Sequence, residues 1–264
     1  MRQYLKNKKR IVIKVGTSSL SYSNGRLNFQ RIANLANVLS SLRRKNLDII
    51  LVSSGAIGVG AGRIGMINKP NDLATKQALA AIGQAELMKI YQKFFEEQGQ
   101  FVAQVLLTKD VVTINDRHQN AKNALLNLLK RGIVPIINEN DTISTYEIEF
   151  GDNDTLSAIV ATLVEADLLI LLSDIDGLFS ADPKSQAGAE IIHTVSEITP
   201  ELEKLASGSG TSFGTGGMIT KIAAAKICHE AQIDTIITNG SDPAIIFDIL
   251  EGKKIGTHFE PRKK

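Results

Sequence analysis

The 264-residue chain lacks several features, and each absence narrows what the protein can be. It has one cysteine, Cys228, which excludes an intrachain disulfide. No apolar run approaches the roughly 18 residues of a membrane-spanning helix, and the short run at 11–15 after the basic start is no signal peptide. The formal net charge is only +2, which gives no reason to expect a nucleic-acid or membrane partner. We therefore expect a cytoplasmic protein.

Common catalytic and cofactor patterns are also missing. The four histidines are far apart and lack metal-ligand spacing, so we expect neither histidine-based catalysis nor a protein-held metal. No G-x4-G-K-[ST] phosphate loop occurs. The glycines at 60, 62 and 65 formally match a dinucleotide-binding pattern. They begin several residues past the nearest predicted strand, however, and no acidic residue ends a second strand about 20 residues on, which excludes that site.

Short apolar segments alternate with segments of helical periodicity along the chain. We predict strands at residues 10–15, 48–53, 101–107, 133–137, 167–173, 234–238 and 255–259, with an edge strand at 191–192. We predict helices at residues 29–45, 71–98, 116–131 and 154–165, and two further helices that begin at residues 200 and 218. The helix at 71–98 should carry Ala78, Ile82, Ala85 and Tyr91 on one side. This alternation is typical of an α/β fold, here a three-layer α-β-α sandwich with a mainly parallel central sheet. We expect residues 1–264 to form a single domain.

Small and charged residues follow the carboxyl ends of four predicted strands, where open parallel sheets bind their ligands. These segments are Lys14–Ser19, Ser54–Gly58, Asn138–Asp141 and Ser173–Asp176. Small residues let backbone N–H groups approach an anion, and Lys14 adds a positive charge beside them. Each segment alone is also compatible with a plain turn. The prediction is therefore that all four meet at one edge of the sheet.

The segment 138–158 holds six carboxylates, and its acidic turns NEND and GDND bracket an alternating stretch at 146–150 that predicts a strand or hairpin arm. Clustered carboxylates repel one another, so they need a cation, a positively charged substrate group or nearby lysines. The alternative is two solvated turns, in which Asp152 or Asp154 only caps the next helix.

Residues 207–217, SGSGTSFGTGG, form the most glycine-rich stretch and lead into a predicted helix that carries Lys221. Free N–H groups and the positive end of the helix dipole favour an anion at such a place, although a flexible linker is the alternative. Lys14, Lys221, glycine turns and carboxylates around one crevice suit phosphoryl transfer, because charge spreads over the oxygens of the transferred group.

The motifs KVGTSSL, VSSGAIGVG, INENDTI, FGDNDTLSA, LLSDIDGLFSADP and GTGGMITK, in this order and spacing, resemble the amino-acid kinase superfamily and, within it, the glutamate 5-kinase family. The resemblance covers nearly the whole chain. It implies an ATP-dependent phosphotransferase acting on the side-chain carboxylate of L-glutamate, the first step of proline biosynthesis, with Mg²⁺ accompanying ATP. Such an acceptor is already ionised at neutral pH, so no general base is required.

The resemblance also implies roles for individual residues. Lys14 and Lys221 match the lysines that hold the phosphates of ATP, and Asp154 matches the carboxylate that orients them. The N-terminal half is expected to bind glutamate through Ser54, Asp141 and Asn153. Residues from about 167 to 264 are expected to bind ATP together with Lys14, through Ser173, Asp174, Thr215, Gly216, Gly217, Met218, Ile219, Thr220 and Lys221; many family members have Thr in place of Ser173.

The family tends to form dimers or tetramers, and residues 71–98 or 116–131 are the segments expected to do so here. Proline resembles the cyclised product and is expected to inhibit at the glutamate site. Many members carry a C-terminal PUA domain, whereas this chain ends at Lys264, so we expect a short form.

Two alternatives stay open. One is another kinase of the superfamily, acting on N-acetylglutamate, aspartate, carbamate or UMP; Asp141 and Asp152 instead favour a substrate with a free α-amino group. The other is a non-catalytic nucleotide-binding regulator, against which the presence of both Lys14 and Lys221 speaks.

Overall fold

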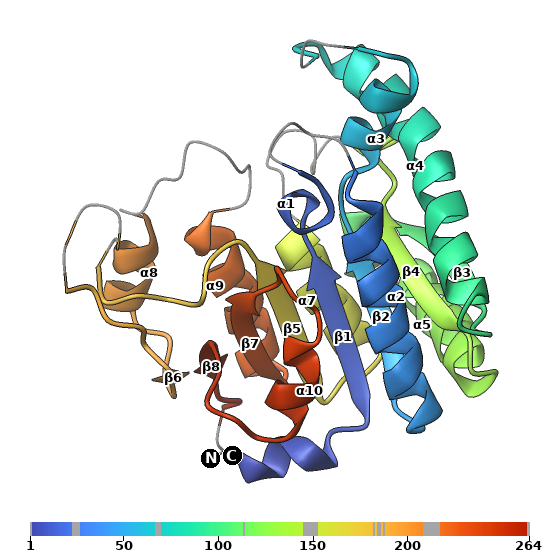
Figure 1. The fold of residues 1–264 in the computed structure, drawn as a ribbon. Helices are drawn as coiled ribbons and strands as arrows, with labels where there is room; N and C mark the ends of the chain where they lie inside the picture. The colour runs from blue at the N-terminus through green and yellow to red at the C-terminus, as the bar shows by residue number, and fades with distance from the viewer. Residues whose placement is uncertain are drawn as a thin grey trace.

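The computed structural model describes residues 2–22, 27–66, 70–112, 114–144, 153–181, 183, 186, 188–207 and 217–262. Within this part of the chain, one eight-stranded sheet has the strand order β3-β4-β2-β1-β5-β7-β8-β6 (Figure 1). The strands are β1 (Arg10–Val15), β2 (Asp48–Ser53), β3 (Val102–Leu107), β4 (Val134–Glu139), β5 (Leu168–Ser173), β6 (Thr194–Val195), β7 (Asp234–Asn239) and β8 (Thr257–Phe259). Neighbouring strands run parallel except β7 and β8. The predicted α/β fold with a mainly parallel sheet is confirmed.

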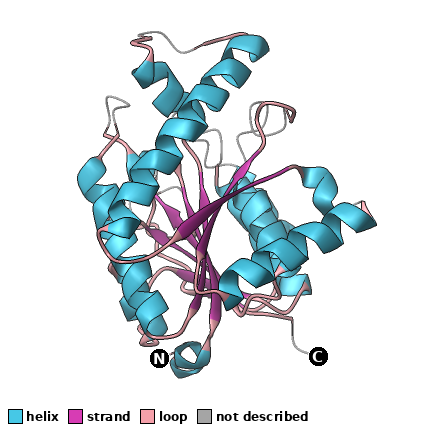
Figure 2. Cartoon of the chain, turned by 90° about the vertical axis from the view of Figure 1, so that its right-hand side faces the viewer, coloured by secondary structure: helices cyan, strands magenta, loops and turns pink. Residues whose placement is uncertain are grey.

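Helices cover both faces of the sheet, which Figure 2 shows between two helical layers. The α-helices are α1 (Thr17–Leu20), α2 (Phe29–Arg44), α3 (Ala56–Arg63), α4 (Leu73–Glu96), α5 (Asn115–Lys130), α7 (Asn153–Leu163), α8 (Pro200–Ser207), α9 (Met218–Glu230) and α10 (Ile245–Leu250), with 3-10 helices η1 (Gln3–Asn7) and η2 (Lys109–Val112). None of the helices in the described ranges is both long and apolar enough to cross a membrane.

The sheet separates two hydrophobic cores. In β1, Val12 belongs to the core that it shares with α5, α7 and α9, whereas Ile11 and Ile13 belong to the core shared with α2, α4 and α10. Alternate side chains of a strand point to opposite faces, so a strand covered on both sides needs an apolar residue at almost every position. This is why the central strands were predictable as continuous apolar runs.

The edge strand predicted at 191–192 is wrong. Ile191 makes only an isolated antiparallel bridge to Phe179, and β6 begins later, at Thr194, where it pairs with β8. A two-residue strand is defined by the neighbour that it pairs with, so its own apolar pattern does not fix its position.

One of the glycines that follow β2, Gly60, serves helix packing together with Gly83 of α4. A Cβ at Gly60 of α3 would lie 2.0 Å from the carbonyl oxygen of Leu79, and a Cβ at Gly83 of α4 would lie 1.7 Å from the carbonyl oxygen of Ala56. Only glycine permits this approach of two helix backbones. The sequence suggested a ligand at this glycine run, but α3 and α4 pack together there.

Helix α4 begins as predicted, because Asp72 accepts a hydrogen bond from the backbone N–H of Thr75. Its predicted inward side is wrong except at Tyr91: Ala78, Ile82 and Ala85 are exposed. The buried residues are Leu79, Ala80, Gly83, Gln84, Leu87, Tyr91 and Phe95. The contact through Gly83 sets which side of α4 faces inward.

Candidate active site

Three central strands end at the same level of the sheet. Val15 of β1 lies opposite Ser53 of β2 and Leu172 of β5, and the backbone N–H of Ser54 donates to the carbonyl of Val15 over 3.2 Å. The segments that follow these strands, which begin at Gly16, Ser54 and Asp174, therefore lie side by side. The predicted meeting of the strand-end segments at one edge is confirmed for these three.

Asp154 lies in the first turn of α7 and holds a lysine on each of its oxygens. Nζ of Lys14, near the end of β1, is 2.7 Å from Oδ1, and Nζ of Lys221, in α9, is 3.1 Å from Oδ2. Thr220 donates to the same Oδ2 over 2.9 Å. All of these groups except the Thr220 side chain are buried. Asp154 therefore joins two cations from distant parts of the chain and does more than cap its helix.

The charge state of Asp154 follows from these contacts. Burial acts to raise the pKa of its carboxyl group, but the ammonium groups of Lys14 and Lys221 outweigh burial and lower the pKa to about 2. The carboxylate is thus ionised at every physiological pH. The ammonium groups of Lys14 and Lys221 make this part of the edge a candidate place for an anion.

The start of α9 supplies the second half of this positive region. Gly217 is its N-cap residue, and its carbonyl lies 2.8 Å from the hydroxyl of Thr220, so this carbonyl and Asp154 are alternative acceptors for the one hydroxyl proton. Met218 is buried in the core, so only its backbone can meet a ligand, while Ile219 is exposed. Thr215 and Gly216, like most of the glycine-rich loop, lie outside the described residues.

A chain of amides lies at the ends of β2 and β4. Nδ2 of Asn153 donates to Oγ of Ser54 and to Oδ1 of Asn138, each over 2.8 Å. Nδ2 of Asn138 donates to Oε1 of Gln84 over 3.0 Å. All four side chains are buried. The structure thus brings the predicted residues Ser54 and Asn153 into contact and adds Asn138, from the predicted strand-end segment 138–141, and Gln84, which the sequence did not single out.

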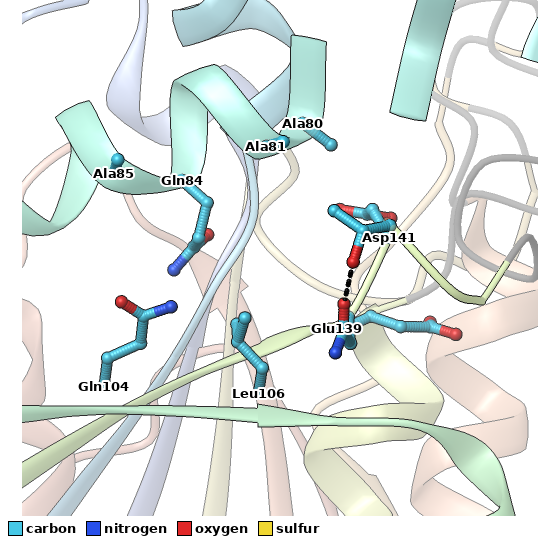
Figure 3. A pocket seen from close by; sticks show the side chains of 10 residues that line it. Ala80, Ala81, Gln84, Ala85, Gln104, Leu106, Glu139 and Asp141 are labelled. Atoms are coloured by element: carbon cyan, nitrogen blue, oxygen red, sulfur yellow. Dashed lines mark hydrogen bonds between the residues drawn. The ribbon is translucent and has the colours of Figure 1, made fainter. Parts of the chain in front are cut away.

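Asp141 lies beside a cavity of about 240 Å³ between α4 and the β3–β4 edge. Figure 3 shows Gln84 and Gln104 together with Asp141 around this cavity. Oδ1 of Asp141 is buried without a hydrogen-bond partner. Burial, together with the nearby carboxylate of Glu139, raises the pKa of Asp141 to about 7. A buried carboxyl group without a partner is a favourable place for a ligand ammonium group.

Ser173 and Asp174 continue β5 at the same edge of the sheet. Ser173 is buried and its hydroxyl donates to Oδ1 of Asp174 over 3.1 Å, while Asp174 itself is exposed. The acidic turn at Asp152 and the hairpin arm predicted at 146–150 lie outside the described residues.

Comparison with known proteins identifies the family. A model of the amino acid kinase family matches residues 9–239. The chain belongs to the amino acid kinase family. Two similar members of this family are a glutamate 5-kinase from Listeria monocytogenes, 53% identical over all of this chain and 97% of that protein, and one from Clostridium perfringens, 51% identical over all of this chain and 99% of that protein. A glutamate 5-kinase from Caldanaerobacter subterraneus is 51% identical, but the match covers only 68% of its length.

Two solved structures have a fold similar to that of this chain. A carbamate kinase from Giardia lamblia bound to AMP-PNP matches with a TM-score of 0.67 over 97% of this chain and 99% of its own. A UMP kinase from Bacillus anthracis matches with a TM-score of 0.62 over 96% of each chain. Both are 15% identical to this chain, so they support the fold alone.

The candidate site of this amino acid kinase contains no preformed metal cage within the described ranges, where no three His, Cys, Asp or Glu side chains gather as metal ligands. Asp154 is already neutralised by two lysines. Such a cage is not required for a metal–nucleotide complex, since Mg²⁺ usually keeps several waters and binds substrate phosphates with one or two carboxylates.

Proposed function

We propose that this chain is a glutamate 5-kinase, which transfers the γ-phosphoryl group of ATP to the side-chain carboxylate of L-glutamate and forms L-glutamyl 5-phosphate. The observation that carries the proposal is the contact of Lys14 and Lys221 with one buried carboxylate, beside the cluster of Ser54 and Asn153. The identity of 51–53% to the glutamate 5-kinases over the whole chain supports this substrate over others. The reaction is the first step of proline biosynthesis.

The phosphoryl group would be transferred beside the two lysines. Negative charge spreads over the equatorial oxygens of the transferred group, so two fixed ammonium groups stabilise it without reorganisation. Asp154, which is itself ionised, keeps both ammonium groups in place. The acceptor carboxylate is ionised at neutral pH, so alignment and charge neutralisation are sufficient and no general base is needed.

The glutamate would lie against the amide cluster and Asp141. The hydroxyl of Ser54, which Asn153 holds in place, is suited to a carboxylate, and Asp141 is suited to the α-ammonium group because its Oδ1 is buried without a hydrogen-bond partner among the described residues. Pairing with an ammonium group would also lower the raised pKa of Asp141. N-acetylglutamate and UMP lack that ammonium group and lose this interaction.

We place ATP over the C-terminal half, residues 167–264, with its phosphates at the start of α9 and with Ser173 and Asp174 facing the nucleotide. A helix N-terminus binds phosphate because its first N–H groups are free and its dipole is positive there. Mg²⁺ would enter with ATP and neutralise part of the phosphate charge.

The deciding experiment is ADP release by the purified protein with a panel of acceptors, namely L-glutamate, N-acetyl-L-glutamate, L-aspartate, carbamate and UMP. We expect release with L-glutamate, at least about tenfold above any other acceptor, the scale of one lost charge-assisted contact. Release with another acceptor only would assign the chain to a different kinase of the family. Nucleotide binding without release for any acceptor would identify a regulator.

Inhibition by proline belongs to the same proposal. Proline carries an ammonium and a carboxylate group on one carbon, as glutamate does, and can occupy the place beside Asp141. We expect millimolar proline to lower the initial rate at subsaturating glutamate and to lose its effect at saturating glutamate. Undiminished rates would contradict a shared site.

We further propose that the chain forms a homo-oligomer through the β3 edge. Among the described strands, β3 pairs with β4 alone, and exposed apolar side chains lie along the neighbouring elements: Ile82 in α4, Phe101 before β3, Val112 in η2 and Ile114 before α5. An unpaired strand edge with apolar neighbours favours association. Light scattering should give a mass of at least two chains, and Phe101→Lys should lower it.

A further inference from the structure

Helix α4 carries one polar side chain on its otherwise apolar inner side, next to Gly83. Gln84 is 8% exposed, and Leu87, one turn further on, is 1% exposed. Burying an amide group costs free energy unless the amide is hydrogen-bonded, so the Gln84 side chain needs a hydrogen-bond partner inside the protein. That partner is Asn138, at the end of β4.

The hydrogen bonds from Gln84 to Ser54 run in one direction. The carbonyl of Ser53 can only accept, and Nδ2 of Asn153 lies 3.3 Å from it, which fixes the nitrogen of the Asn153 amide on this side. The same nitrogen donates to Oδ1 of Asn138, so the nitrogen of Asn138 must face Gln84. Oε1 of Gln84 is therefore the acceptor that ends the series.

This direction determines what Ser54 can do. Its hydroxyl oxygen accepts a hydrogen bond from Asn153, and Oγ of Ser54 has no other hydrogen-bond partner within the described ranges. A hydroxyl has one proton to donate, and here that proton is left for a ligand. A carboxylate, which only accepts, is the complementary group.

We propose that Gln84 is a positioning residue of the glutamate-binding end, acting through Asn138 to fix the amide of Asn153 and thereby to direct the Ser54 hydroxyl toward the substrate. The inference rests on the proposed function and deepens it. Gln84 itself need not touch glutamate.

The packing of α3 on α4 holds this arrangement together. α3 begins directly after Ser54 and Gly55, and the carbonyl of Ala56 lies against Gly83, the neighbour of Gln84. On the same inner side of α4, Tyr91 is hydrogen-bonded over 2.8 Å to Oγ of Ser53. Both ends of the amide series are thus supported by one helix pair.

The test replaces Gln84 by Met, which keeps the unbranched length but removes the acceptor oxygen. We expect Gln84→Met to raise the KM for glutamate on the order of tenfold, the scale of one buried donor left unsatisfied. The kcat and the KM for ATP should stay within about twofold, since the lysine contacts are untouched. Gln92→Met, an exposed position on the same helix, is the matched control and should change none of these constants. Gln84→Leu is the second variant if the first folds poorly, as judged by thermal unfolding.

A double-mutant cycle shows whether Gln84 acts through Asn138. If it does, Gln84→Met should add little to the KM of Asn138→Leu, because the donor that Gln84 satisfies is already gone. Changes in KM that multiply, or an unchanged KM in Gln84→Met, would overturn the proposal. Wild-type protein is assayed beside the variants, and a wild type without glutamate-dependent ADP release would instead contradict the proposed function itself.

Discussion

Lys14 and Asp154 meet although they lie far apart in the chain: Nζ of Lys14 is 2.7 Å from Oδ1 of Asp154, which is 1% exposed. β1 delivers the lysine and the first turn of α7 delivers the carboxylate, so the contact exists only in the folded sheet. Lys221 completes it on the other oxygen. The reactivity and the stability of this protein are both expected to depend on this group.

Replacement of Lys221 tests the catalytic role of the two lysines that contact Asp154. We expect Lys221→Ala to lower kcat on the order of 10²-fold or more, the scale of losing one preorganised charge contact in the transition state. Lys226→Ala is the matched control on α9, because Lys226 is exposed and pairs only with surface carboxylates such as Glu203. Steady-state rates of ADP release give the kcat of both variants. A near-normal kcat for Lys221→Ala would show that Lys221 has no catalytic role.

Asp154 should contribute to stability in a pH-dependent way. Its folded pKa of about 2 lies below the ordinary 3.8, so its stabilisation is present above pH 4 and is lost as the pH falls toward 2. Asp154→Asn removes the carboxylate that both buried ammonium groups contact and should lower the free energy of unfolding at pH 7 by roughly 3–5 kcal/mol. Denaturant unfolding of both proteins should show this difference shrinking below pH 4.

A second substitution checks the cause. Adding Lys14→Met to Asp154→Asn removes the buried ammonium group that contacts Oδ1 of Asp154, and part of the lost stability should return. A double variant as unstable as the sum of the two single variants would mean that the charges are not responsible.

The raised pKa of Asp141 predicts how glutamate binding depends on pH. Only the ionised carboxylate attracts an ammonium group, so the KM for glutamate should fall as the pH rises from 6 to 8, through the pKa of about 7. In Asp141→Asn the KM should be high and nearly independent of pH over this range. Initial rates at several glutamate concentrations give the KM at each pH. A parallel pH dependence of the KM in wild type and variant would contradict the role of Asp141 in binding the ammonium group.

The same pKa has the opposite effect on the stability of the free protein. A folded pKa of about 7 against an ordinary 3.8 means that the contribution of Asp141 is present below pH 4 and is lost as the pH rises through 7. Asp141→Asn should therefore raise the Tm relative to wild type at pH 8, and the gain should disappear near pH 4. Thermal unfolding at the two pH values tests this, and an equal Tm difference at both would be inconsistent with a buried titrating group.

The approach of α3 and α4 predicts contrasting effects for two glycines. Gly83→Ala would place a Cβ 1.7 Å from the carbonyl of Ala56, so the helices must separate, at a cost of roughly 2 kcal/mol or more. Gly62→Ala meets no atom within 4 Å and should be neutral or stabilising by about 0.5–1 kcal/mol, since alanine favours helix. Comparable losses in the two variants would show that the contact does not matter.

Most of the sheet could be predicted because its strands are short apolar runs covered on both sides. The bounds of β1 and β2 agree with the prediction, and helix α5 differs by one residue at each end. α3 and β6 could not be predicted: a run with glycines at 58, 60 and 62 resembles a loop, and a two-residue strand depends on its partner. In both cases tertiary contacts outweigh local preference.

The positions of candidate site residues could be predicted where charged or small polar residues stand at or just after the carboxyl end of a predicted strand, as for Lys14, Ser54 and Asp141. Asn138 lies in the predicted segment at the end of β4, although no role was assigned to it, whereas Gln84 could not be found in this way. A single amide within a helical pattern resembles an exposed residue, and only the contact through Gly83 turns Gln84 inward. The contact between Thr220 and Asp154 likewise appears only when α7 and α9 are packed together.

The most direct test of the account is glutamate-dependent hydroxamate formation by the purified protein with ATP, Mg²⁺ and hydroxylamine, which traps an acyl phosphate. The account predicts hydroxamate in amounts equal to the ADP released, none without glutamate, and on the order of 10²-fold slower formation in Lys221→Ala. ADP release without hydroxamate, or equal rates in wild type and Lys221→Ala, would contradict it.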